Sequence, residues 1–100
     1  MEAKKKPTVI KIGGSTLGSL DTTLQDVVAL QKQGLVPLVV HGGGSTIDEW
    51  MKRQGLMPRF IRGLRVTDDS SLQIVVAVLA GLVNKQLVAA ITALGGKAIG

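Results

Sequence analysis

The hydrophobic positions fall into short continuous runs that alternate with segments of helical period. Residues 8–12 and 35–40 are apolar runs rich in β-branched side chains, and glycines follow each run almost at once. Such runs are typical of buried strands that end in tight loops. Between them, residues 21–33 have helical spacing, a Thr22/Gln25 capping box and a closing Gly34. The pattern predicts a strand, a helix and a second strand.

The alternation continues beyond the second strand. Thr46 and Glu49 match a capping box for a second helix, which is expected to end near Gly55. Residues 56–66 have no clean period and contain a proline and a glycine, so we expect a hairpin or an irregular excursion there.

A long helix is predicted from Asp68 or Asp69 to about residue 94, where two glycines would close it. The last four residues, 97–100, have the character of an opening third strand. The main apolar stripe of the helix is Leu72, Val75, Val76, Leu79, Val83, Leu87, Ala90 and Leu94. Its opposite side carries Ile74, Ala77, Val78, Gly81 and Leu82.

A helix that is apolar around most of its girth is usually buried on two sides. Either the rest of the same subunit covers the second side, or a two-fold partner does. In the second case we expect a homodimer through the helix between Leu72 and Leu94, with Gly81 allowing close approach of two helices.

Strands with almost no polar alternation, separated by helices, imply a parallel sheet with helices on both faces. The predicted fold is therefore α/β, a three-layer αβα sandwich with a mainly parallel sheet. The length of 100 residues corresponds to about one small domain.

Composition excludes several kinds of site. The chain has no cysteine, so disulfides, thiol nucleophiles and cysteine-ligated metal sites are ruled out. A single histidine, His41, gives no conventional metal cluster, and no metal ligand is expected from the chain. No apolar run reaches 18 residues without interruption, so we expect no membrane span and a cytoplasmic protein.

The net charge of +5 is concentrated in two places. Three lysines lie near the start, and a second basic cluster contains Lys52, Arg53, Arg59, Arg62 and Arg65. Charge alone would permit a nucleic-acid-binding domain. The chain lacks interleaved aromatic residues and any known nucleic-acid-reading motif, so a small anionic ligand is the favoured partner and no nucleic acid is expected.

Both glycine-rich loops follow a predicted strand and precede a predicted helix. In open α/β sheets ligands bind at the carboxyl ends of the strands, where helix N-termini offer unpaired N–H groups to anions. The motifs of P-loop and dinucleotide-binding proteins are absent. The sequence His-Gly-Gly-Gly at 41–44 resembles a lipase oxyanion motif, but the required nucleophile elbow is missing.

Lys11 is the only charged residue in the first apolar strand, close to the glycines that end it. A strand-end lysine can simply reach solvent. Alternatively, it is a cation directed into the ligand crevice, where it would neutralise charge on a transferring phosphoryl group.

Four motifs, in order and with family-like spacing, resemble the amino-acid kinase superfamily: Val-Ile-Lys-Ile-Gly-Gly at 9–14, Val-Val-His-Gly-Gly-Gly at 39–44, Gly-Leu-Arg-Val-Thr at 63–67 and Leu-Ala-Gly-Leu-Val-Asn-Lys at 79–85. The last two narrow the resemblance to the acetylglutamate kinase branch. A related kinase of lysine biosynthesis, which acts on carrier-bound α-aminoadipate, is the nearest alternative.

The resemblance implies ATP-dependent phosphorylation of the side-chain carboxylate of N-acetyl-L-glutamate in arginine biosynthesis. Lys11 would be catalytic and would contact ATP, and its Mg²⁺ would be held mainly by the ATP phosphates. The site residues that it implies are Gly13 and Gly14 for the ATP phosphates, Gly43 and Gly44 for the acylated amino acid, and Arg65 for the α-carboxylate. A planar, forked guanidinium suits that last task. His41 is expected to shape its loop rather than to transfer a proton.

Family members are more than twice as long as this chain. The resemblance therefore implies that residues 1–100 form the N-terminal, amino-acid-binding lobe and that the ATP-binding lobe is absent from this chain. We expect these residues alone to have no appreciable kinase activity. A non-catalytic module that binds an amino acid or another small anion with the same fold is a further alternative.

Overall fold

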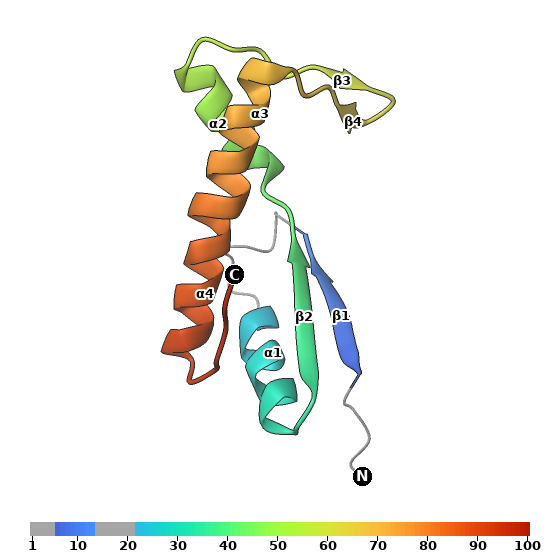
Figure 1. The fold of residues 1–100 in the computed structure, drawn as a ribbon, viewed down its shortest axis with the longest axis vertical. Helices are drawn as coiled ribbons and strands as arrows, with labels where there is room; N and C mark the ends of the chain where they lie inside the picture. The colour runs from blue at the N-terminus through green and yellow to red at the C-terminus, as the bar shows by residue number, and fades with distance from the viewer. Residues whose placement is uncertain (1–5, 14–21) are drawn as a thin grey trace.

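The computed structural model describes residues 6–13 and 22–100 (Figure 1). The elements are β1 (Pro7–Ile12), α1 (Thr23–Lys32), β2 (Val36–His41), α2 (Gly44–Arg53), β3 (Phe60–Ile61), β4 (Leu64–Arg65), α3 (Asp69–Val76), the π-helical segment η2 (Ala77–Val83) and α4 (Asn84–Ala93). Their order agrees with the predicted alternation of strands and helices, and the ambiguous segment 56–66 contains a hairpin.

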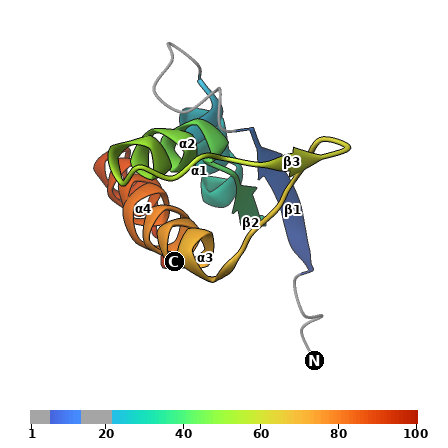
Figure 2. The ribbon, with the colours of Figure 1, turned by 90° about the horizontal axis from the view of Figure 1, so that it is seen from above.

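Strands β1 and β2 pair in parallel, with Pro7 opposite Val36 and Ile12 opposite His41. The parallel pairing confirms the predicted α/β class. Figure 2 shows the helices gathered on one side of this sheet. The other face carries exposed apolar side chains, with Val9 64% and Leu38 52% exposed. In the described part of the chain helices thus cover only one sheet face, whereas the apolar runs predicted cover on both.

The predicted helix ends are confirmed by backbone geometry. Gly34, Gly55 and Gly95 follow the three helical stretches with φ values of 92°, 73° and 88°. This left-handed conformation is strained for residues that have a Cβ atom. Positive φ at Arg62 and Gly63 also forms the two-residue turn between β3 and β4.

Two predicted capping boxes are wrong. The Thr22 hydroxyl donates to the Asp26 carboxylate instead of accepting a bond from a backbone N–H. The second helix starts at Gly44, so Thr46 and Glu49 lie inside it. The glycine loop itself forms the start of that helix, which the side-chain pattern alone did not indicate.

The long helix runs from Asp69 to Ala93, but its buried face differs from the predicted stripe. Leu72 and Val76 are 50% and 55% exposed, whereas its buried apolar residues are Ile74, Val78, Val83, Leu87 and Ile91. The step from Val78 to Val83 is five residues and falls within η2. A π-helical turn contains more residues than an α-helical turn, so this step keeps one face buried along the whole helix.

The core lies between α2 and the long helix. Its buried residues are Ile47, Met51, Ile74, Val78, Val83 and Leu87. Many large apolar side chains lie outside this core and are exposed. The Cα radius of gyration is 15.9 Å. A compact domain of this length has a radius of about 13 Å. The described chain is therefore extended, as Figure 1 shows.

The long helix is long and apolar enough to cross a membrane by length and composition. Polar residues interrupt this helix, so the expectation that no apolar run reaches 18 residues still holds. Core helices of soluble proteins share this property, and here one face of the helix packs in the core.

Residues 97–100 form no strand in this structure. The Gln31 side chain instead pairs with the backbone of Lys97: its Nε2 donates to the carbonyl at 2.8 Å and its Oε1 accepts from the N–H at 2.9 Å. A side-chain amide thus supplies both bonds that a neighbouring strand would make there.

Asp68 caps the long helix, as the sequence predicted, and accepts a bond from Ser71 N at 2.8 Å. We expect Asp68→Ala to lower the melting temperature, because that N–H loses its side-chain acceptor. Asp68→Asn retains a neutral acceptor and should recover part of the loss. Asp69→Ala, at the next position, is the matched control. Equal melting temperatures for Asp68→Ala and Asp69→Ala would contradict the capping role.

The same contact makes stability depend on pH. The backbone hydrogen bond from Ser71, its hydroxyl and the nearby Arg59 hold the pKa of Asp68 below its ordinary value of 3.8. The stabilisation is therefore complete above that value and is lost as pH falls through the lowered pKa. We expect the stability advantage of wild type over Asp68→Ala to shrink in acid, measured by urea unfolding at several pH values. An advantage that does not change with pH would exclude a contribution from the charged carboxylate.

Candidate functional site

The two glycine loops begin at the same level of the sheet. Lys11 is opposite Val40 and Ile12 is opposite His41, so that Gly13 and Gly42 each follow the last paired residue. This register confirms the expectation that the two loops lie at one edge of a parallel sheet. Gly14 lies outside the described residues.

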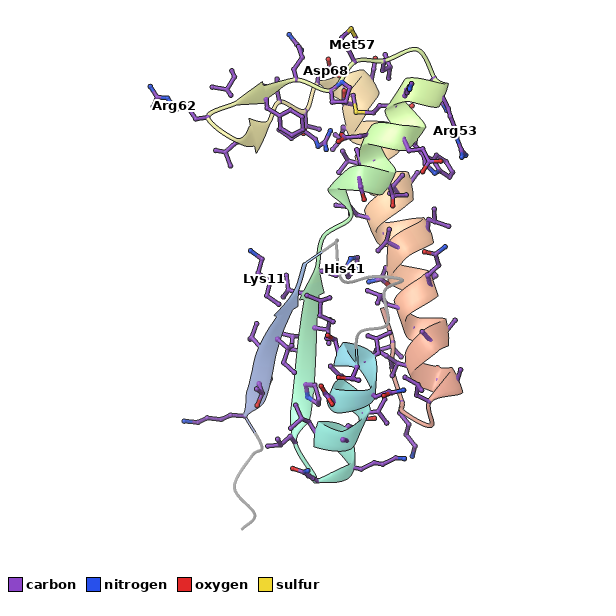
Figure 3. All side chains as sticks on the ribbon, turned by 180° about the vertical axis from the view of Figure 1, so that it is seen from behind. Lys11, His41, Arg53, Met57, Arg62 and Asp68 are labelled. Carbon is purple, nitrogen blue, oxygen red and sulfur yellow. The ribbon has the colours of Figure 1, made fainter. Side chains whose placement is uncertain are left out.

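Lys11 is exposed, whereas the next residue, Ile12, is buried. The Lys11 side chain lies near the carboxyl end of β1 and points away from the helices (Figure 3). Within residues 6–13 and 22–100, no carboxylate forms an ion pair with it. Its amino group therefore lies in solvent on the side of the sheet that the described helices leave uncovered.

Gly43 is buried at the N-cap of α2. A Cβ atom at this position would lie 3.0 Å from Leu79 Cδ2 and 3.2 Å from Val83 Cγ2. The loop packs directly on η2, so that any larger side chain here would require Leu79 and Val83 to shift. The adjoining Gly44 opens α2, and the first N–H groups of a helix lack intrahelical partners. These groups and the helix dipole favour an anion at this point.

His41 links this loop to the long helix (Figure 3). Its Nδ1 lies 3.0 Å from the Gly42 carbonyl, and its Nε2 lies 3.1 Å from Asn84 Nδ2. The carbonyl can only accept, so Nδ1 carries the proton and Nε2 accepts from the amide of Asn84. Both ring nitrogens are thus engaged in holding the loop. The geometry gives Asn84 a role that the sequence had not supplied.

Arg65, on β4, reaches the start of α2. Its Nη2 donates to the Asp48 carboxylate at 2.7 Å and to the Gly44 carbonyl at 3.4 Å. Its guanidinium carbon lies 4.8 Å from the centre of the Phe60 ring. The side chain is only 15% exposed. The structure therefore brings together Arg65 and Gly44, two residues that the family resemblance assigns to one substrate site.

The second basic cluster is less cationic than the sequence suggested. Three of its arginines pair with carboxylates outside the cluster: Arg53 with Glu49, Arg59 with Asp68 and Arg65 with Asp48. Two of these pairs are well exposed, and exposed pairs contribute little stability. The Arg65 pair is the one whose guanidinium is largely shielded from solvent.

A cavity of about 330 Å³ lies between β2, α1, α4 and residues 97–99, and its lining includes His41 and Asn84. Apolar side chains dominate its lining, and none of the predicted site residues lines it. It runs along β2 rather than beyond the ends of the strands. Among the described residues, no three His, Cys, Asp or Glu side chains gather to hold a metal ion.

Sequence reasoning missed Asp48 as the partner of Arg65. The available signal was its spacing: Asp48 lies four residues after Gly44, so that both occupy the same face of α2. No local pattern indicates that the hairpin folds back onto this face, because that contact joins residues 17 positions apart.

Comparison with known proteins agrees with these features. The model of the amino acid kinase family matches residues 6–100. Acetylglutamate kinase from Dehalococcoides mccartyi is 52% identical over 92 residues, covering 92% of this chain and 34% of that protein. Acetylglutamate kinase from Thermoanaerobacter pseudethanolicus is 47% identical over 100 residues, with coverage of 95% and 33%. The chain thus spans about a third of the length of these relatives.

Solved structures share the fold. The crystal structure of smu.665 from Streptococcus mutans UA159 matches with a TM-score of 0.80 and 33% identity, covering 89% of this chain and 37% of that one. N-acetylglutamate synthase from Neisseria gonorrhoeae, complexed with coenzyme A and N-acetyl-glutamate, matches with a TM-score of 0.70 and 31% identity over 88% of this chain and 21% of that one. The paired glycine loops on a parallel sheet, the family match over residues 6–100 and these shared folds establish that the chain belongs to the amino acid kinase family.

Proposed function

We propose that the protein containing this chain transfers the γ-phosphoryl group of ATP to the side-chain carboxylate of N-acetyl-L-glutamate, a step of arginine biosynthesis. The observation that carries the proposal is the contact of Arg65 with Gly44 at the start of α2, beyond the end of β2. The acetylglutamate kinases among the relatives support this choice of substrate.

The acylated amino acid binds between the glycine loop and the hairpin in this proposal. Arg65 holds the α-carboxylate, because a guanidinium donates to a carboxylate through two parallel N–H groups. Gly43 and Gly44 hold the rest of the substrate through the backbone at the start of α2. The partial positive charge of that helix end supports an anion there.

ATP binds at the first glycine loop. Gly13 and Gly14 offer N–H groups to its phosphates, and Lys11 contacts the transferring group. Mg²⁺ accompanies ATP and is held mainly by the phosphates. No ligand cluster in the described residues argues for a separate metal site in this chain.

In the chemical step a carboxylate oxygen forms a bond to the γ-phosphorus, and the bond from that phosphorus to the β–γ bridging oxygen breaks. The products are an acyl phosphate and ADP. The nucleophile is already ionised, so no residue has to remove a proton. Lys11 stabilises the charge on the transferring phosphoryl group, which is the main task of a protein in this chemistry.

Residues 1–100 form the amino-acid-binding lobe of a longer cytoplasmic enzyme in this proposal, and a further, ATP-binding lobe holds the adenine and ribose of the nucleotide. Relatives three times as long support this division. Because phosphoryl transfer requires both partners to be positioned together, this chain alone is expected to be inactive. We assign it neither a nucleic-acid partner nor a membrane partner.

A second function is favoured by one comparison. The N-acetylglutamate synthase match indicates that this fold also occurs in a protein of a different activity. The chain would then be a non-catalytic module that binds an amino acid. Carrier-bound α-aminoadipate is the alternative substrate if the protein is a kinase.

We also propose a homodimer through the helix between Leu72 and Leu94. The exposure of Leu72 and Val76 supports this interface. A Cβ atom at Gly81 would meet nothing within 4 Å, so there is also open space for a second helix at this position.

Lys11→Met tests the proposed reaction. We expect kcat in the full-length protein to fall about 10²- to 10³-fold, as when one charge-stabilising donor is removed, while N-acetyl-L-glutamate still binds. The measurement is ATP-dependent acyl phosphate formation, trapped with hydroxylamine. Lys6→Met, an exposed lysine just before β1, is the control. Binding of the amino acid without any wild-type turnover would favour the non-catalytic module, and full activity of Lys11→Met would contradict the role of Lys11.

Gly81→Leu tests the proposed dimer. An isolated helix would tolerate leucine at this open position, and its helix propensity is better than that of glycine by about 0.8 kcal/mol. In a close helix pair the same side chain separates the two subunits. We therefore expect light scattering to give a dimer for wild type and a monomer for the variant. A monomeric wild type, or a variant that remains dimeric, would exclude this interface.

A further inference from the structure

The hairpin that carries Arg65 is too small to hold this side chain in a fixed position by itself. Strands β3 and β4 contain two residues each and pair only with one another among the described residues. Figure 1 shows the hairpin projecting from the body of the chain, and Ile61 and Leu64 are 65% and 75% exposed. An isolated two-stranded hairpin is marginally stable in water. Something outside the hairpin must therefore fix the Arg65 side chain beside the glycine loop.

Asp48 supplies that support from α2. Its carboxylate accepts from Arg65 Nη2 at 2.7 Å, and the same nitrogen lies 3.4 Å from the Gly44 carbonyl. Asp48 and Gly44 are one helical turn apart. The charged hydrogen bond is the shorter of the two, and such bonds are about twice as strong as neutral ones. The guanidinium is thus held against the first turn of α2.

Two further contacts fix the plane of the guanidinium. Nη1 of Arg65 lies 3.6 Å from Met51 Sδ, and the Phe60 ring lies on one face of the group at 4.8 Å. Helix α2 and the hairpin therefore contact the Arg65 guanidinium from two sides. A free arginine side chain loses rotamer entropy when it is ordered. Ordering it before the ligand arrives removes part of that cost from binding.

The pair also changes which anions the site accepts. With Asp48 beside it, Arg65 is not an isolated cation, and a simple anion gains less from approaching it. A ligand must instead match the donors that the fixed guanidinium and the start of α2 present. Asp48 thereby weakens the attraction of Arg65 for anions in general and favours a ligand whose acceptors match the fixed donors.

We infer that Asp48 is a positioning residue that holds Arg65 in the orientation that binds the α-carboxylate of the amino-acid substrate. The inference rests on the proposed function, since it assigns a support to the same site. Asp48 touches neither reacting atom, and its effect passes through Arg65. It therefore acts on substrate affinity rather than on the chemical step.

The test compares Asp48→Ala, Asp48→Asn and Glu49→Ala in the full-length protein. We expect Asp48→Ala to raise KM for N-acetyl-L-glutamate about tenfold, with kcat and the KM for ATP unchanged. Asp48→Asn keeps an oxygen at the same place and should recover most of the loss. Glu49→Ala removes the neighbouring exposed ion pair with Arg53 and should leave KM at its wild-type value.

Three results would overturn the inference. KM could stay constant or fall in Asp48→Ala, which would show that Asp48 does not position Arg65 or that it competes with the ligand. Glu49→Ala could raise KM equally, which would indicate a general effect of the helix. The KM for ATP could rise by the same factor, which would indicate damage to the whole site.

A second readout separates this inference from the proposed function. In ¹⁵N spectra of the ligand-free protein, we expect a slowly exchanging guanidinium signal of Arg65 that Asp48→Ala abolishes and Glu49→Ala preserves. If wild type shows that signal but does not phosphorylate N-acetyl-L-glutamate, the proposed function fails and the positioning role stands. If turnover is normal and the signal does not depend on Asp48, the positioning role fails.

Discussion

Gly43 lies so close to the π-helical turn η2 that a methyl group there would approach Leu79 Cδ2 to 3.0 Å and Val83 Cγ2 to 3.2 Å. This contact joins the end of β2 to the longest helix of the chain. Dense packing transmits small displacements, so the position of the loop depends on the shape of the helix surface beneath it. The five-residue step of the π turn shapes that surface, because it places Val78 and Val83 on the same buried face.

Polar contacts then extend this arrangement to both sides of the loop. On the helix side, Asn84 donates to the single histidine, whose other ring nitrogen faces the Gly42 carbonyl. On the hairpin side, Arg65 bonds to Asp48 and Gly44. The loop is thus held by the packing of Gly43 on η2 and by hydrogen bonds near Gly42 and Gly44. A backbone fixed in this way can present N–H groups to an anion without reorganising, which is the property that electrostatic catalysis requires.

The features that the sequence predicted are local ones. Strand β1, strand β2 and the closing glycines follow from runs of side chains and from backbone φ values, and these depend on few neighbours. Asp68 could be predicted as a helix cap because this contact is also local: its carboxylate accepts from the backbone N–H of a residue three positions later. The site residues Lys11 and Arg65 were chosen from motifs, and the structure places them on separate elements near the end of the sheet.

What sequence reasoning missed depends on tertiary contacts. The early start of α2 at Gly44 arises from the packing of Gly43 on η2, which is distant in sequence. The π turn shifts the buried face relative to a regular helical stripe, so Leu72 and Val76 were assigned to the wrong side. The Asp48 partner of Arg65 depends on the fold-back of a hairpin that has little periodicity of its own. The strand pattern predicted helices on both faces of the sheet. Whether a face is covered depends on where the helices pack, which the strand residues do not encode.

The central claim is that the glycine loop after β2 and the Arg65 guanidinium form one anion site. Titration of ¹⁵N-labelled protein with N-acetyl-L-glutamate tests it most directly. If the loop and Arg65 form one site, the amide signals of Gly43 and Gly44 and the guanidinium signal of Arg65 shift together, with one dissociation constant. Shifts confined to the residues that line the cavity along β2, such as Val39 and Leu87, would contradict it.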